Sequence, residues 1–185
     1  MDAIEAIRTR RSVGKVKPEA PAKEDIALLL DLAVQAPNHH LTEPWRFCVL
    51  AGRAREELGR ALEAALAATG EADEAKLAKE RAKPLRAPVV IVVSAKPGKD
   101  EIETHENRMA AAAAVENLLL AAHASGLGAM WRTGDTMYSP QVSQYLGLAL
   151  GEMVLASVYV GYPDMPLRPG RRTAAVQFTT WRGWE

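Results

Sequence analysis

The sequence predicts one domain in which helices are layered on a sheet of about four strands. The chain has 185 residues, which is the usual size of a single domain. Segments with strand-like and helix-like apolar patterns alternate along it, an order typical of α/β layers. The sequence contains no internal repeat that would indicate an array of small units. We therefore expect residues 1–185 to fold as a single domain.

Four segments have the apolar runs that are typical of β-strands. They are residues 45–50, 88–95, 127–131 and 153–162. Residues 88–95 are almost entirely apolar, so we expect them to form a central strand that is buried on both faces. The glycines at 126 and 128 do not form a dinucleotide-binding motif, because the third glycine is missing and the segment leads from a helix into a strand.

The N-terminal helix is predicted by its cap and by its apolar spacing. Asp2 can cap the helix, and Ile4 and Ile7 lie three residues apart. The basic pair Arg10-Arg11 would lie at the end of the helix, where the helix dipole favours positive charge. We expect a turn at residues 12–14, directly after this helix.

Three further segments are expected to be helical. The second helix has one buried face, and Pro37 is expected to end it. Helices are also predicted at 53–68 and from residue 139 onward, and the charged stretch 70–83 is expected to be helical or mobile. The apolar positions of the second helix follow i, i+3, i+4 spacing: Ile26, Leu29, Leu30, Ala33 and Val34.

The longest predicted helix runs from about residue 106 to residue 125, where Gly126 stops it. Alanine, valine and leucine make it apolar on nearly every side, so it must be buried in the core or in a subunit interface. The tail from residue 163 onward has little core of its own. We expect its β-like segment 175–181 to pack along a neighbour, with the partner subunit as one option.

Composition excludes several classes of protein. Lysine plus arginine and aspartate plus glutamate number 23 each, so the formal net charge is zero and we expect no nucleic-acid partner. Cys48 is the only cysteine, which excludes an intramolecular disulfide and suits a reducing cytoplasm. The four histidines lack metal-binding spacing, so we expect no metal site. Without a signal peptide or a membrane-spanning run, the protein is expected to be soluble and cytoplasmic.

The first helix ends in three consecutive polar residues, Arg10, Arg11 and Ser12. Two guanidinium groups and a hydroxyl at one place can bind a phosphate or the electron-rich edge of a heterocycle. Taken alone, the motif is more typical of a solvated helix end. Its meaning therefore depends on the motifs that follow it.

In their order and spacing, six segments resemble the nitroreductase family of FMN enzymes. That family opens with a helix ending in an Arg-Arg-Ser type motif, continues with a helix ending in Ala-Pro and a Gln-Pro-Trp type element, and closes with a Gly-Tyr/Thr-Pro turn. The segments here are Arg10-Arg11-Ser12, Ala36-Pro37-Asn38-His39-His40, Pro44-Trp45, residues 106–125, residues 126–134 and Val160-Gly161-Tyr162-Pro163. The resemblance implies an α+β fold, with flanking helices on a central, mostly antiparallel sheet, in a homodimer with a swapped C-terminal tail.

The resemblance also implies an FMN site at the dimer interface. The implied contacts are Arg10, Arg11 and Ser12 from one subunit, Gln35 and His39 from the other, and Trp131, Arg132 and Thr133 along the ring or ribityl chain. A cation near N1 and O2 of the flavin and a hydrogen-bond partner near N5 would suit its chemistry. No side chain is expected to be catalytic, because N5 of the flavin carries the reaction.

Several positions depart from the family or leave a choice open. Many members carry a basic residue two positions after the serine, where this chain has Gly14, and Lys15 is a candidate replacement. Glu43 stands where many members have Gln before Pro-Trp, which affects the expected acceptor preference. The candidates for a tail arginine at the phosphate are Arg168, Arg171 and Arg172.

The function implied by the resemblance is electron transfer from NAD(P)H to nitroaromatic, quinone or related small acceptors. A ping-pong mechanism is expected, because a single exposed flavin face would serve both substrates in turn. Two alternatives stay open. One is a flavoenzyme of the same fold with another reaction, such as dehalogenation, enone reduction or flavin fragmentation. The other is a non-catalytic FMN-binding dimer. The choice between NADH and NADPH and the physiological acceptor also stay open.

Overall fold

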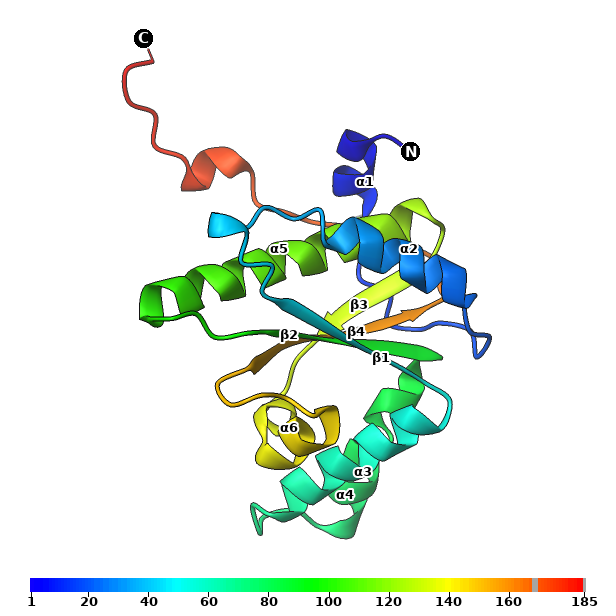
Figure 1. Ribbon diagram of the computed structural model, residues 1–185. Coiled ribbons are helices and arrows are strands. Elements are labelled where there is room, and N and C mark those ends of the chain that lie inside the picture. The colour runs from blue at the N-terminus through cyan, green and yellow to red at the C-terminus, as the bar shows by residue number, and fades with distance from the viewer. Residues whose placement is uncertain (168–169, 185) are drawn as a thin grey trace.

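The computed structural model describes residues 1–167 and 170–184, so the expectation for Arg168 lies outside the described residues. One sheet forms the middle of the molecule, with helices on both faces (Figure 1). Its strands are β1 (Trp45–Ala51), β2 (Val89–Ala95), β3 (Gly128–Arg132) and β4 (Met153–Gly161). The strand order is β1-β2-β4-β3. All seven residues of β2 are buried, which confirms the predicted central strand.

Every neighbouring pair of strands is antiparallel, which makes the fold α+β. The alternation of helix and strand is more typical of parallel layers. Here two helices between β1 and β2, α3 (Arg53–Ala67) and α4 (Glu74–Arg81), contact each other. They form a helical hairpin that returns the chain to the end of the sheet where β1 stopped. The next strand therefore runs antiparallel to β1.

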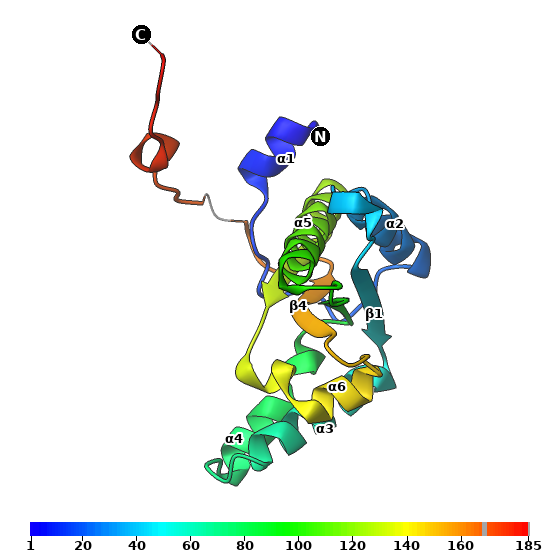
Figure 2. The same cartoon turned by 60° about the vertical axis from the view of Figure 1, so that its left-hand side comes forward.

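One face of the sheet is covered by α2 (Lys23–Ala33) and α5 (Glu101–Ala124), as both views show (Figures 1 and 2). α5 begins earlier than residue 106, because the side chain of Asp100 caps it by accepting from the backbone N–H of Glu103 at 2.8 Å. α2 ends before Pro37, since the residue before a proline disfavours helical geometry. The fully buried side chains of this layer include Leu29, Ile91, Leu118 and Val158.

The opposite face is covered by α3, α4 and α6 (Pro140–Leu146), with two short 3-10 segments, η2 (Lys83–Arg86) and η3 (Asp135–Tyr138). The charged stretch 70–83 thus contains a helix, α4. Between this helical layer and the sheet lies a second core, which includes Leu58, Leu62, Val90 and Tyr159. No described helix has both the length and the apolarity that crossing a membrane requires.

The segment after the first helix is not the turn predicted at residues 12–14. It is extended along the outer edge of β3, where the backbone N–H of Val13 donates to the carbonyl of Ala129 at 3.0 Å. Val13 is buried and lies against Gly128, where even a single Cβ would come within 2.8 Å of Val13 Cγ1. The apolar Val13 side chain therefore draws this segment against the sheet edge.

Both ends of the chain project from the layers on the side of α5 (Figures 1 and 2). At the N-terminus, α1 (Ala3–Thr9) has the predicted cap, with Asp2 accepting from the backbone N–H of Glu5 at 2.8 Å. In the tail, residues 175–181 are not a strand but contain a 3-10 turn, η4 (Ala175–Phe178). A strand needs a hydrogen-bonding neighbour, and the described part of this chain provides none for the tail.

Candidate functional site

The end of α1 brings the Arg10 guanidinium against the central helix. Arg10 Nε lies 3.4 Å from Oε1 of Glu116 on α5, and the Arg10 side chain is only 18% exposed. Glu116 was not predicted as a site residue. It is the one charged residue between positions 109 and 120, and a lone acid in an apolar helix is a signal that could have identified it.

Arg11 lies between the end of α1 and the C-terminal tail. Its Nη1 donates to the carbonyls of Arg8 at 2.9 Å and of Arg10 at 2.6 Å. Its Nε is buried and has no hydrogen-bond partner among the residues that the structure describes. The tail passes directly over it, since a Cβ on Gly170 would lie 2.4 Å from this nitrogen. Ser12 follows as an exposed residue, at the start of the extended segment beside β3.

The positive charge at this edge affects His123, a histidine of α5. Nε2 of His123 lies 2.8 Å from Oγ1 of Thr9. Burial lowers the pKa of His123, and the guanidinium groups of Arg10 and Arg11 lower it further. The part of this effect that comes from Arg10 and Arg11 reflects their positive charge, which favours an anion at the same place.

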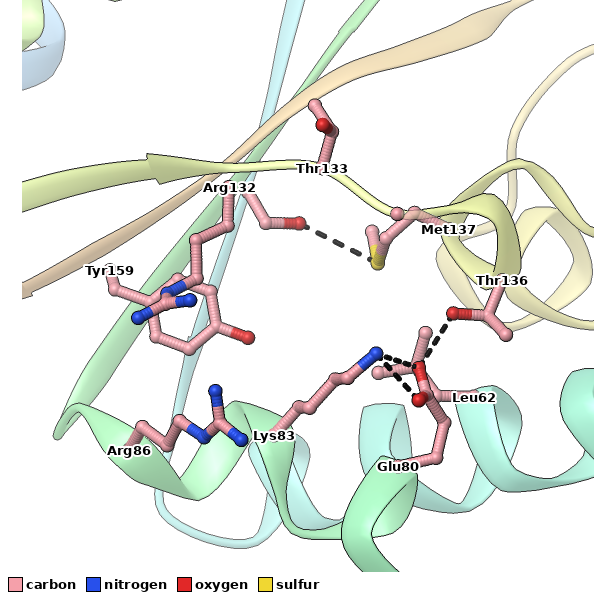
Figure 3. Close-up of a pocket in the computed structure, with 11 residues that line it drawn as sticks. Leu62, Glu80, Lys83, Arg86, Arg132, Thr133, Thr136, Met137 and Tyr159 are labelled. Atoms are coloured by element: carbon pink, nitrogen blue, oxygen red, sulfur yellow. Dashed lines mark hydrogen bonds and ion pairs between the residues drawn. The ribbon is translucent and has the colours of Figure 1, made fainter. Parts of the chain in front are cut away.

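The last residues of β3 point to opposite faces of the sheet, as successive strand residues do. Trp131 packs in the core beneath α5, and its Nε1 donates to the carbonyl of Leu155 at 3.2 Å. Arg132 lies on the other face, with its guanidinium carbon 5.4 Å from the centre of the Tyr159 ring (Figure 3). Thr133 is exposed just beyond the strand. Within one chain, the structure thus does not bring the guanidinium groups of Arg10 and Arg132 together.

The other two predicted flavin contacts lie along α2 and the loop after it. Gln35 is exposed, and its Nε2 donates to the carbonyl of Asp31 at 3.3 Å. Nδ1 of His39 lies 2.8 Å from Oε2 of Glu106 on α5. Glu106 and the Arg10 partner Glu116 are ten residues apart on one helix, which corresponds to about 15 Å. His39 and Arg10 therefore meet α5 at separate places within one chain.

The loop that carries His39 has a strained backbone. His40, Leu41 and Glu43 have φ angles of 54°, 52° and 43°, a region that residues other than glycine seldom adopt. Oγ1 of Thr42 donates to Oδ1 of the buried Asn107 at 2.8 Å, which ties the loop to α5. Leu41 and Glu43 are exposed as a result.

The remaining candidate cations are exposed. Nζ of Lys15 lies 2.6 Å from Oδ2 of Asp164, and the hydrogen bond and charge of Lys15 hold the pKa of Asp164 below its usual value. Lys15 thus already has an anionic partner. Arg171 and Arg172 are exposed on the tail, where Arg172 Nη1 donates to the carbonyl of Arg171 at 3.0 Å.

A comparison with known protein families matches residues 7–162 to the nitroreductase family. The chain belongs to this family. A protein of Escherichia coli K12 named "Putative NAD(P)H nitroreductase YdjA" is 34% identical over 166 residues, covering 89% of this chain and 90% of that protein. A solved nitroreductase-like family protein from Bacillus cereus has a TM-score of 0.88 and 27% identity, over 100% of this chain and 97% of the other.

A solved nitroreductase with bound FMN from Bacteroides fragilis has a TM-score of 0.77 and 26% identity, over 98% of this chain and 100% of the other. In the present chain, the family match begins inside α1 and ends just after β4. It therefore includes the Arg10-Arg11-Ser12 segment and the whole sheet. Together, the family match and these structures confirm the nitroreductase-like α+β fold.

Proposed function

We propose that this nitroreductase is an FMN-dependent enzyme that takes electrons from NAD(P)H and passes them to nitroaromatic, quinone or related small acceptors. The observation that carries the proposal is the pair of guanidinium groups at Arg10 and Arg11 beside β3, including a buried donor without a partner in the described chain. Such a donor is unfavourable unless an acceptor reaches the same group. The name of YdjA and the FMN in the Bacteroides fragilis structure support the electron donor and the cofactor.

The proposed FMN site needs two copies of the chain. If two α5 helices cross antiparallel near their middle, the Glu106 end of one lies beside the Glu116 end of the other. His39 of one subunit then approaches Arg10 of its partner. The exposed or half-exposed side of α5 supports this packing because it is mostly apolar or small: Met109, Ala112, Ala113, Glu116 and Leu120. We propose the swapped tail as a second contact between the subunits.

In this arrangement Arg10 and Arg11 hold the FMN phosphate through charge-assisted hydrogen bonds, each contributing about 1.5–3 kcal/mol. Ser12 and Thr133 face the cofactor from one subunit, and the Gln35 and His39 positions reach it from the other. The side chains of Trp131 and Arg132 point to opposite faces of the sheet, where Trp131 packs in the core and Arg132 lies over Tyr159. We propose that these two contacts fix the end of β3 beside the cofactor. FMN, when bound, supplies hydride exchange at N5, so the protein contributes charge and orientation.

We also propose that residues 1–185 form one domain and that it acts in the cytoplasm. The single cysteine, Cys48, is free, and burial raises the pKa of its thiol, which favours the protonated form over the nucleophilic thiolate. Such a thiol has no role in the proposed reaction.

Purified protein is expected to be yellow, to release FMN on denaturation, and to oxidise NADH or NADPH when a quinone or nitroaromatic is added. Arg10→Ala is expected to weaken FMN binding about tenfold or more, since it removes a charged phosphate contact. His105→Ala on the exposed N-terminal part of α5 is the matched control and should change neither property. Mass spectrometry of the released flavin and NAD(P)H absorbance provide the two readouts.

Two outcomes would contradict this proposal in different ways. A colourless protein that does not take up added FMN would show that the chain does not bind this cofactor. A yellow protein that turns over neither nicotinamide with any acceptor indicates an FMN-binding dimer without this activity.

We expect ping-pong kinetics, because one exposed face at an interface has to serve the nicotinamide and the acceptor in turn. Initial rates measured against NAD(P)H at several acceptor concentrations should give parallel double-reciprocal lines. Lines that intersect, with an acceptor that is not itself inhibitory, would indicate a ternary complex and a separate acceptor site.

A further inference from the structure

A polar cavity lies on the face of the sheet that α3 covers, opposite α5. Figure 3 shows the side chains that line it. It has a volume of about 210 Å³ and is enclosed by β3, β4, α3, α4 and the segments η2 and η3. Its main polar side chains are Glu80, Lys83, Arg86, Arg132, Thr136 and Tyr159. Arg132 and Thr133 line it at the end of β3, and Thr133 is also one of the residues that the proposed FMN site uses. The proposed redox function assigns no role to this cavity.

The one carboxylate in the cavity is already neutralised. Glu80 is buried, with 7% of its surface exposed. It accepts from Lys83 Nζ, whose ion pair measures 2.5 Å, and from Oγ1 of Thr136 at 2.7 Å. A buried carboxylate needs such partners. Glu80 and Lys83 therefore compensate each other and leave two guanidinium groups in excess.

These two guanidinium groups, of Arg86 and Arg132, have no carboxylate partner among the residues drawn in Figure 3. Both line the same cavity as Tyr159, and the guanidinium carbon of Arg132 lies 5.4 Å from the centre of the Tyr159 ring. Burial raises the pKa of Tyr159, while the charges of Arg132 and Arg86 act to lower it. The hydroxyl thus stays protonated at neutral pH and is a donor, and no residue in Figure 3 bonds to it.

We propose that this cavity binds a small tetrahedral oxyanion of the phosphate type, held by Arg86, Arg132 and the Tyr159 hydroxyl. All three groups are donors, and guanidinium groups bind such oxygens strongly. The volume of about 210 Å³ is below the roughly 300 Å³ at which pockets for larger organic ligands begin, so a nucleotide would not fit. The bound anion joins the end of β3, through Arg132, to η2, through Arg86. The anion therefore stabilises the packing of the layer formed by α3, α4 and α6 against the sheet.

The test measures phosphate binding by the FMN-loaded protein in phosphate-free buffer, with ionic strength held constant by sodium chloride. Calorimetry and the thermal unfolding temperature are followed as inorganic phosphate is added. Arg86→Gln should weaken saturable binding about tenfold or more, and Tyr159→Phe should weaken it less. Arg81→Gln is the matched control, because Arg81 is an exposed arginine of α4 that pairs with Glu63 outside the cavity. It should bind phosphate like the wild type.

Equal flavin absorbance in all four proteins separates this site from the FMN phosphate site. Absence of saturable binding, or equal weakening in Arg86→Gln and Arg81→Gln, would overturn the proposal. A second measurement needs no variant: crystals of the wild-type protein with FMN are soaked in selenate. We expect an anomalous peak between Arg86 and Arg132, and a map without one there also overturns the proposal.

Discussion

At the scale of single residues, the guanidinium groups of Arg10 and Arg11 affect how the protein responds to acid. Burial, followed by these two charges, lowers the pKa of His123 in the folded protein from its ordinary value of 6.5, while Glu5 acts in the opposite direction. Between the lowered pKa and about 6.5, the unfolded chain therefore binds more protons than the folded one. The contribution of His123 to stability is complete above pH 6.5 and is lost as the pH falls through the folded pKa.

We expect His123→Gln to reduce this loss of stability at acidic pH. The unfolding temperature of the wild type should fall more between pH 7.5 and pH 5.5 than that of the variant, because the variant has no imidazole to protonate. His105→Gln, at the exposed other end of α5, should keep the slope of the wild type. Identical slopes for all three proteins would show that His123 does not contribute.

The Arg10-Arg11-Ser12 motif could be predicted from the sequence because it is local: consecutive polar residues follow a capped helix. Its partners could not. Glu116 follows Arg10 by more than 100 residues, and only the packing of α1 on α5 brings them together. Arg132 shows a second limit. Strand alternation predicts that it points away from Trp131, but no local pattern tells which face of the sheet a cofactor would use.

At the scale of elements, the close contact between the N-terminal segment and β3 gives a testable requirement. We expect Gly128→Ala to destabilise the protein by about 1–3 kcal/mol, because the new methyl group would lie 2.8 Å from Val13 Cγ1 and must displace that side chain. Chemical denaturation measures the effect. Gly134→Ala is the control, since nothing lies within 4 Å of a Cβ there.

A double variant distinguishes this steric cause from a general loss of β3. Val13→Ala creates room, so combining it with Gly128→Ala should destabilise less than the sum of the two single changes. Additive effects would show that the two residues do not press on each other.

Most elements were predictable because strands and helices impose a period on apolar residues. The exceptions follow from what periodicity omits. The first turn of α5 is polar except for the exposed Ile102, so the apolar pattern starts too late, although Asp100 lies where a cap residue would. Residues 175–181 have the composition of a strand but no strand beside them, and composition alone cannot supply that neighbour. The antiparallel order came from the family resemblance, since alternation alone favours parallel layers.

At the scale of the whole molecule, several large apolar side chains of α1, α5 and the tail stay exposed. They include Ile4, Ile7, Met109, Phe178, Trp181 and Trp184. Both α1 and the tail project from the layers (Figure 1). A soluble monomer rarely exposes so much apolar surface, and permanent dimers typically bury roughly 2,000 Å² or more. We expect light scattering to give about 40 kDa, twice the chain mass of 20.0 kDa.

Exchanging Trp181 and Trp184 together for alanine should weaken this dimer, because it removes two exposed aromatic rings from the tail. The matched control exchanges Leu85 and Leu150, exposed residues outside α1, α5 and the tail, and should leave the mass unchanged. A wild-type monomer of 20.0 kDa that still holds FMN would contradict both the dimer and a site shared between subunits.

The helix α5 also has a consequence for how this sequence can vary. Glu106 and Glu116 hold the two halves of the proposed site, and the alanines at 110–114 lie between them. One residue inserted there would rotate Glu116 by about 100° and move it by about 1.5 Å relative to Glu106. Each alanine can be replaced by another small residue, whereas the number of residues between Glu106 and Glu116 has to stay the same. The run thus acts as a spacer, and related chains should tolerate substitutions there but not insertions or deletions.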